Sequence, residues 1–112
     1  MSINAKIEAA LAGLVTNIHP MVCRDESPPK EYIVYNPEIT RPDDFGDNCA
    51  NEWVAYMQVH YFCKGNYLKK ERQIREALLA AGFFVSEIVT MYDKESKYNH
   101  TCISCGMEES ED

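Results

Sequence analysis

The sequence predicts an α+β domain with a mostly antiparallel sheet of about four to five strands and two helices packed on one face. Two segments repeat apolar residues at helical spacing, and several others alternate in the way strands do. A short turn separates the last two strands, so they are expected to pair antiparallel. With 112 residues, 46% of them hydrophobic, the chain can build one core. We expect this single domain over residues 1–107, followed by a disordered acidic tail over residues 108–112.

The first half of the chain predicts one helix and two strands. Residues 3–14 carry a helical stripe that Ser2 or Asn4 can cap. A short strand is expected at 21–23. The segment that follows, 24–30, contains two consecutive prolines and predicts a loop. The next segment, 31–36, reads "EYIVYN", which is rich in β-branched and aromatic residues and predicts a strand.

The stretch from Pro37 to Ala50 is polar, contains two prolines and a glycine, and predicts a long loop of the kind that tends to be functional or mobile. The clearest strand pattern follows over residues 51–63. Alternation places Trp53, Ala55, Met57, Val59 and Tyr61 on one face of that strand, and Val54, Tyr56, Gln58, His60 and Phe62 on the other.

The second half predicts a helix over 67–81 with Asn66 as its cap and Gly82 at its left-handed end. The outward side of this helix carries mostly charged residues: Lys69, Lys70, Arg72, Arg75 and Glu76. Strands are expected over 83–92 and 97–107, joined by the turn "DKES".

Charge and cysteine usage exclude several classes of protein. The formal net charge is −7, and four of the acids lie in the last five residues. A net-negative chain without a basic stripe is poorly suited to gripping nucleic acid. We see no export signal, and the longest nearly unbroken apolar run spans 77–85, which is too short to cross a membrane. Five cysteines, an odd number, favour an intracellular environment with reduced thiols.

The stretch "HTCISCG" raises the question of a metal or redox site, because Cys102 and Cys105 have the spacing of a zinc knuckle. His60 and Cys63 share that spacing and offer a second pair of ligands. In a regular strand, however, Cys102 and Cys105 point to opposite faces. We therefore favour a strand, and keep a zinc-stabilised binding module as the alternative.

No arrangement of residues in the sequence predicts catalysis. The chain has no phosphate-binding glycine loop and no nucleophile elbow. The acids Glu38, Asp43, Asp44 and Asp47 lack the order of a calcium loop. We predict a protein that is not an enzyme and needs no cofactor.

The length of the predicted strands points instead to assembly. A strand of thirteen residues would extend up to about 44 Å, whereas a domain of this size is roughly 35 Å across. Apolar residues occur on both faces of the strand, and two helices cannot cover both. An apolar surface left exposed in this way normally marks a protein–protein interface.

The order of elements resembles the tail terminator and tail-completion (head–tail joining) proteins of long-tailed bacteriophages and prophages. The likeness covers residues 3–107 and rests on "PMVC", "PKEYIVY", a polar loop ending in "DN", "IREALLAAGF" and the final "YDKESKYNH" hairpin. It implies a non-enzymatic subunit of a hexameric ring that ends tail-tube polymerisation. Such a ring contacts the tube protein and the head connector, and DNA only passes through it. The implied location is the virion, assembled in the bacterial host cytoplasm.

By the same resemblance, the loops over 24–30 and 36–48 are candidates for contacts with the tube or the connector. The residues expected to make contacts in and beside these loops are Arg24, Glu26, Asp43, Asp44, Phe45, Asp47 and Trp53. Besides the zinc module, a third hypothesis is a monomeric acidic inhibitor that mimics nucleic acid. It is disfavoured because much of the charge lies in the predicted tail rather than on a patterned surface.

Overall fold

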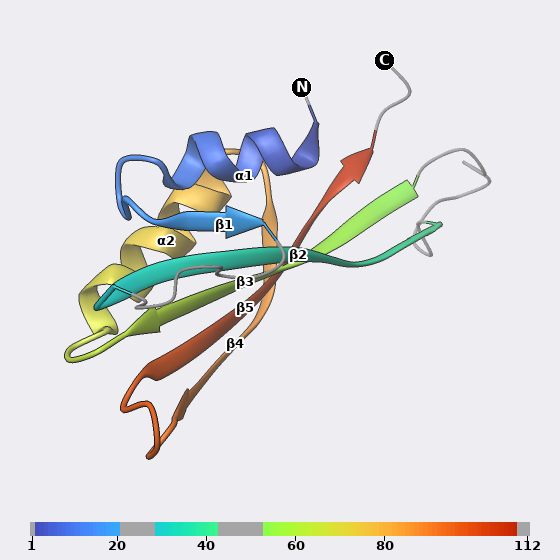
Figure 1. Ribbon diagram of the computed structural model, residues 1–112. Helices are drawn as coiled ribbons and strands as arrows, with labels where there is room; N and C mark the ends of the chain where they lie inside the picture. Colours follow the sequence, from blue (N-terminus) through green and yellow to red (C-terminus); the bar gives the residue numbers. More distant parts are fainter. Residues whose placement is uncertain (1, 21–28, 43–52, 110–112) are drawn as a thin grey trace.

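The computed structural model describes residues 2–20, 29–42 and 53–109, and over them the chain forms one five-stranded sheet with two helices on the same face (Figure 1). The strand order is β1-β2-β3-β5-β4. The short β1 runs parallel to β2, and every other pairing is antiparallel. The predicted fold class is therefore confirmed: the sheet is mixed but mostly antiparallel.

The elements follow one another as helix, three strands, helix and two strands. Their bounds are α1 (Ile3–Leu11), β1 (Ile18–Pro20), β2 (Glu31–Pro42), β3 (Trp53–Cys63), α2 (Leu68–Ala80), β4 (Phe84–Tyr92) and β5 (Asn99–Glu109). β3 and β5 lie at the centre of the sheet and pair along their whole length, from Trp53 opposite Glu109 to Cys63 opposite Asn99.

Local signals in the sequence set the ends of both helices. The Ser2 hydroxyl caps α1 by accepting from the backbone N–H of Ala5 at 3.2 Å. The Asn66 side chain accepts from the N–H of Leu68 at 3.0 Å, which satisfies one free donor at the start of α2. At the other end of α2, Gly82 has a φ of +98°.

The residue after this glycine completes the end of α2. The N–H of Phe83 donates to the carbonyl of Leu78 at 3.0 Å, and that of Gly82 donates to the carbonyl of Leu79 at 3.1 Å. These two bonds form a Schellman motif, which turns the chain from α2 into β4.

The core lies between the helices and one face of the sheet. α1 contributes Ile7 and Leu11, and α2 contributes Ile74 and Leu78, all fully buried. The sheet supplies the alternating residues that face them, namely Ile33, Tyr35, Met57, Val59, Tyr61, Cys63, Ile103 and Cys105. Of the two faces of β3 that its alternation distinguishes, the one that carries Ala55, Met57, Val59 and Tyr61 is the buried one.

β2 is longer than predicted. Residues 37–42, expected to begin the polar loop, continue the strand and pair with β3 through Pro42 opposite Trp53. A register shift between Pro37 and Ile39 accommodates the irregular backbone. β1 pairs only with Ile33–Tyr35, so this part of β2 is a sheet edge in the described residues, and proline is tolerated at edges and bulges.

Three other differences concern the ends of elements. The short strand expected at 21–23 lies outside the described residues, and β1 precedes it. β5 continues two residues into the predicted acidic tail, because Glu108 and Glu109 pair with Val54 and Trp53. α1 ends three residues early, since the chain turns at 12–14.

The molecule is elongated, with principal extents of 48, 24 and 22 Å. β2 and β3 run past both helices at the end where Pro42 and Trp53 pair (Figure 1). Neither described helix is long and apolar enough to span a bilayer.

Candidate assembly surface on the open face of the sheet

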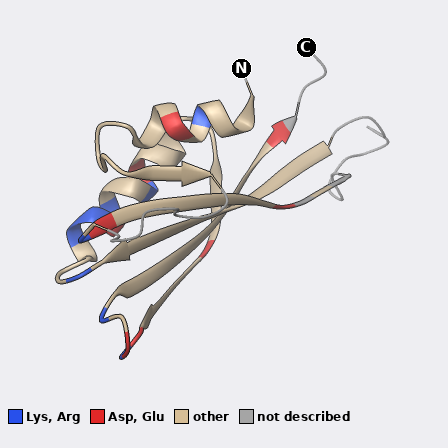
Figure 2. Ribbon diagram, viewed as in Figure 1, with Lys and Arg blue, Asp and Glu red and all other residues tan. Residues whose placement is uncertain are grey.

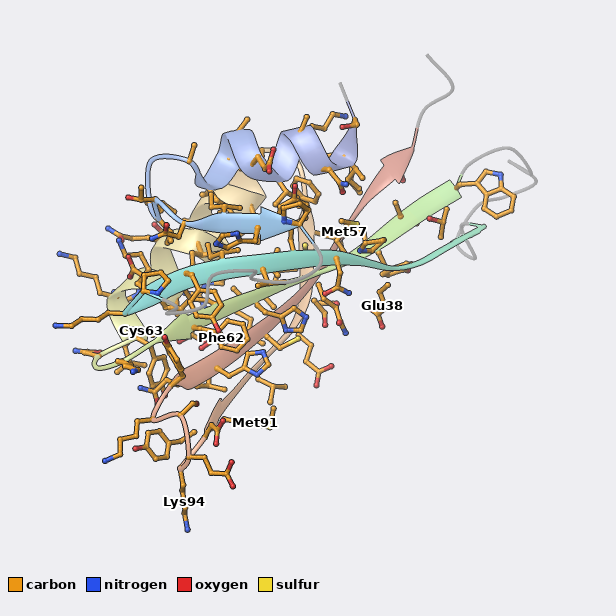
Figure 3. All side chains as sticks on the ribbon, in the orientation of Figure 1. Glu38, Met57, Phe62, Cys63, Met91 and Lys94 are labelled. Atoms are coloured by element: carbon orange, nitrogen blue, oxygen red, sulfur yellow. The ribbon has the colours of Figure 1, made fainter. Side chains whose placement is uncertain are left out.

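The side of the sheet that faces away from the helices is the main candidate site, and we call it the open face. Residues directly opposite each other on paired strands share a face, so the pairing of β2, β3, β5 and β4 shows which residues belong to the open face on each strand. Its residues mix aromatic, polar and charged side chains: Tyr32, Val34, Asn36, Tyr56, Gln58, His60, Phe62, His100, Cys102, Ser104, Glu87, Val89 and Met91. Figure 3 labels Phe62, Met91 and Glu38, which lie on the side of β2 away from α1.

One end of the open face is an aromatic cluster. The rings of Tyr32 and Phe62 stack at 4.6 Å, and Phe62 stacks in turn on His100 at 4.4 Å. Tyr98 packs edge-on against Tyr32 at 5.5 Å. The Tyr98 hydroxyl donates to the carbonyl of Pro29 at 2.7 Å, and the Lys64 ammonium lies 4.8 Å from the centre of its ring. These contacts join β2, β3 and β5 at this end of the open face.

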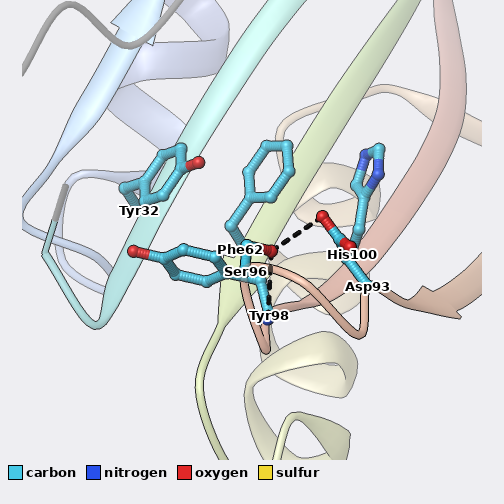
Figure 4. Close-up of a pocket in the computed structure, with 6 residues that line it drawn as sticks. All are labelled: Tyr32, Phe62, Asp93, Ser96, Tyr98 and His100. Atoms are coloured by element: carbon cyan, nitrogen blue, oxygen red, sulfur yellow. Dashed lines mark hydrogen bonds between the residues drawn. The ribbon is translucent and has the colours of Figure 1, made fainter.

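A pocket of about 320 Å³ opens beside the aromatic cluster (Figure 4). The Ser96 hydroxyl donates to the Asp93 carboxylate at 2.8 Å, and this bond lowers the pKa of Asp93. An ionised carboxylate at the exposed tip of a hairpin is a poor general base. The pocket is of a size to hold a side chain or a small fragment. Its lining residues are Tyr32, Phe62, Asp93, Ser96, Tyr98 and His100.

A second pocket, of about 290 Å³, lies at the start of α2. Several of its polar groups have partners within the chain: the Tyr61 hydroxyl donates to Glu31, and the Lys70 ammonium donates to the carbonyl of Leu14 at 2.7 Å. The first bond joins β3 to β2, and the second joins α2 to the turn after α1. We assign this pocket a structural role.

Two histidines lie side by side in the middle of the open face. His60 Nε2 is 3.0 Å from Asn36 Oδ1, and His60 Nδ1 is 2.9 Å from His100 Nε2. Asn36 donates its amide N–H to the carbonyl of Pro37, so its oxygen faces His60. His60 then donates to Asn36 from Nε2 and accepts from His100 at Nδ1. Burial lowers the pKa of both histidines, and His100 lowers that of His60 further. Both rings are therefore mainly neutral at pH 7.

The four residues proposed as zinc ligands do not converge. His60 and Cys102 are cross-strand partners on the open face, whereas Cys63 and Cys105 are buried in the core. Four ligands divided between two faces of a sheet cannot bind one ion. Within residues 2–20, 29–42 and 53–109, no three metal-binding side chains come together. The zinc alternative built on these four residues is therefore wrong.

Neither Cys102 nor Cys105 is activated for redox catalysis. Burial raises the pKa of Cys102, and the nearby carboxylates of Glu38 and Glu87 raise it further. Burial raises the pKa of Cys105 to about 12. Both cysteines are protonated at neutral pH, and a thiol in that state is a weak nucleophile.

The carboxylates near Cys102 make the middle of the open face acidic. Glu38 and Glu87 approach it from β2 and β4. Basic residues are instead concentrated on α2, on the helix side of the sheet (Figure 2). The sheet and the outer side of α2 therefore carry opposite charge.

Most of the contact residues predicted from sequence lie outside the described residues. These are Arg24, Glu26, Asp43, Asp44, Phe45 and Asp47. Trp53 begins β3 and is 44% exposed. It lies on the same face of the strand as the buried Ala55 and Met57, but the helices do not extend to this end.

Sequence reasoning did not single out Val89 and Met91, which are 42% and 56% exposed. The alternation within β4 was the available signal, since Ile88 and Val89 must face opposite ways.

No protein-family model and no curated protein matches this chain. Among solved structures it is similar to a chain in the virion of a native gene transfer agent (GTA) particle, with a TM-score of 0.63 and 11% identity, over 96% of this chain and 93% of that one. A likeness of this extent shows a shared fold.

A weaker likeness is to a chain from the structure of an extracellular contractile injection system, the PVC sheath/tube terminator in the extended state. Its TM-score is 0.42 at 9% identity, and the match covers 99% of this chain and 58% of that chain. The stronger match alone supports the assignment of fold.

Proposed function

We propose that the chain is a non-enzymatic structural subunit of a long-tailed phage or prophage particle, in which a ring of its copies ends the tail tube and joins it to the head connector. The observation that carries this proposal is the fold shared with a GTA virion chain over nearly the full length of both proteins. The resemblance in the order of elements points to the tail terminator among virion proteins.

The chemistry of the open face supports a surface for contact rather than reaction. Its two histidines are neutral and hydrogen-bonded to each other, its thiol is protonated, and Asp93 is held by Ser96. A catalytic site needs a nucleophile or base poised to react. Aromatic rings and exposed aliphatic side chains over several strands are instead typical of protein interfaces.

The charge of the chain suits a ring that surrounds DNA. The net charge is −7, and removing the four acids of the last five residues leaves a body of −3. A weakly acidic wall repels phosphates, so DNA would slide through without binding. The partners in this proposal are further copies of the chain, a tube protein and a head-connector protein. The particle would assemble in the bacterial host cytoplasm.

For contacts with the tube and connector we propose Trp53, at the end of the molecule where β2 and β3 project beyond the helices. The other residues proposed to take part, Arg24, Glu26, Asp43, Asp44, Phe45 and Asp47, lie outside the described residues. An exposed tryptophan at a projecting end is a typical anchor for a protein partner.

Removing the protein from the particle tests this function. In a phage or prophage that encodes the chain, deleting the coding sequence should yield filled heads without tails and headless tails of uncontrolled length, as counted by electron microscopy. Supplying the chain from a plasmid should restore complete particles. Complete particles with tails of normal length in the deletion strain would overturn the proposal.

A further inference from the structure

The outer side of α2 carries a stripe that the core does not use. Leu68, Arg72, Arg75 and Leu79 follow one another at intervals of four, three and four residues, so they lie along one line of the helix. All four are exposed, and the two leucines are 60% and 52% exposed. Exposed leucines together with paired arginines fit a partner surface that combines acidic and apolar side chains. We call these four residues the α2 stripe.

The open face of the same chain offers a surface of that description. Glu87, Val89 and Met91 point the same way from β4, because each pairs with an open-face residue of β5. Glu38 belongs to β2 and is close enough to Cys102 of β5 for its charge to raise the pKa of that thiol. The charge of Glu87 has the same effect from β4. Two carboxylates beside two exposed aliphatic side chains complement two guanidinium groups between two leucines.

The two surfaces are of similar length: Leu68 to Leu79 spans about 16 Å along a helix, and Glu87 to Met91 spans about 13 Å along a strand. Glu38 and Glu87 lie three strand spacings apart, about 14 Å, which the long side chains of Arg72 and Arg75 can reach from one line of the helix. Arginine forms bidentate hydrogen bonds with carboxylates, so Arg72 and Arg75 suit Glu38 and Glu87 better than lysines would. Neither surface is complementary to itself, because one is basic and the other acidic.

We propose that the α2 stripe of one copy of this chain docks on the open face of the next copy, over Glu38, Glu87, Val89 and Met91. This inference rests on the proposed ring and identifies its contact. The two surfaces lie on opposite sides of each molecule, so every bound copy keeps one of each free. A contact between unlike surfaces of this kind produces a ring or an open chain rather than a closed dimer.

Charge reversal tests the pairing directly. In a helix variant, Arg72→Glu/Arg75→Glu, the α2 stripe becomes acidic and would meet the acidic open face of the next copy. In a sheet variant, Glu38→Lys/Glu87→Lys, the open face becomes basic and would meet the basic α2 stripe of the next copy. Each variant alone should associate at least about tenfold more weakly than the wild type. A 1:1 mixture of the two should recover assembly, because acidic stripes then meet basic sheets and basic stripes meet acidic sheets.

Native mass spectrometry reads the result, because the two variants differ in mass and a recovered assembly should alternate them in equal number. A matched control, Lys30→Glu/Lys94→Glu, changes the net charge as much as the helix variant but leaves every residue of the proposed contact in place, and should assemble normally. Circular dichroism checks that every variant is folded. Variants that assemble like the wild type, or folded variants whose mixture does not recover assembly, would overturn the inference.

Disulfide trapping gives a second measurement. In a Cys23→Ser/Cys49→Ser background, the change Arg75→Cys should crosslink to the native Cys102 of the next copy under mild oxidation. A denaturing gel should show a ladder of multimers, which Cys102→Ser should abolish. A product that stops at the dimer would contradict a contact between unlike surfaces.

Failure of this inference can be told apart from failure of the proposed function. A wild-type chain that stays monomeric up to millimolar concentration overturns the inference, and the deletion experiment still decides the function. Conversely, variants that assemble normally while the deletion strain makes headless tails would leave the terminator role in place with a different subunit contact.

Discussion

The two faces of the sheet are built from the same strands yet have opposite characters. On the helix side, Val59 and Ile103 are partners in a closed aliphatic core. One residue along each strand, His60 and Cys102 are partners on the open face, among polar and aromatic neighbours. Core residues give the chain its stability, whereas the open face keeps exposed Val89 and Met91 that contribute little to it.

Truncating one valine on each side is the strongest test of this contrast. Val59 is fully buried and Val89 is 42% exposed. Val59→Ala should lower the free energy of unfolding by about 2.5 kcal/mol, from lost burial and a cavity. Val89→Ala should change it by less than about 0.5 kcal/mol. Urea denaturation followed by circular dichroism measures both, and equal costs would contradict the division between the faces.

A glycine on β5 should give an intermediate effect. A Cβ on Gly106 would meet the ring of Phe84 and would lie 3.0 Å from the carbonyl oxygen of Ala55. Gly106→Ala should therefore destabilise by about 1–2 kcal/mol, because the exposed phenylalanine can move but the backbone cannot. Gly13→Ala is the control, since nothing lies within 4 Å of its Cβ position. Equal unfolding temperatures for the two variants would show that the backbone around Gly106 moves to make room for the added methyl group.

The histidine pair should give the smallest effect, as a pH dependence. His60 and His100 have pKa values below 6.5 in the folded chain, so the unfolded chain binds protons more readily. Their contribution to stability is complete above pH 6.5 and declines as the pH falls below it. The variant His60→Gln/His100→Gln should lose stability less steeply between pH 7 and 5 than the wild type. The free energy of unfolding is measured by urea denaturation at each pH. If it falls equally with pH in the variant and the wild type, the two histidines do not change their pKa values on folding.

Much of the fold could be predicted because its signals are local. The caps at Ser2 and Asn66, the glycine after α2 and the alternation in β3 each depend on residues a few positions apart. Alternation along β5 likewise separates Cys102 from Cys105, so the sequence pattern was sufficient to argue against a zinc knuckle. By contrast, residues 37–42 contain prolines that favour a loop, and only pairing with β3 keeps them in a strand.

The assembly surface depended on tertiary structure. The sequence alone determined the two helices, most of the strands and the acidic balance, because periodicity, caps and composition are properties of neighbouring residues. The order of strands brought Glu38 of β2 and Glu87 of β4 to the same cysteine of β5, although they are far apart in the chain. It also placed the α2 stripe on the side away from them. Which side chains share a surface is set by non-local pairing, and no local pattern encodes it.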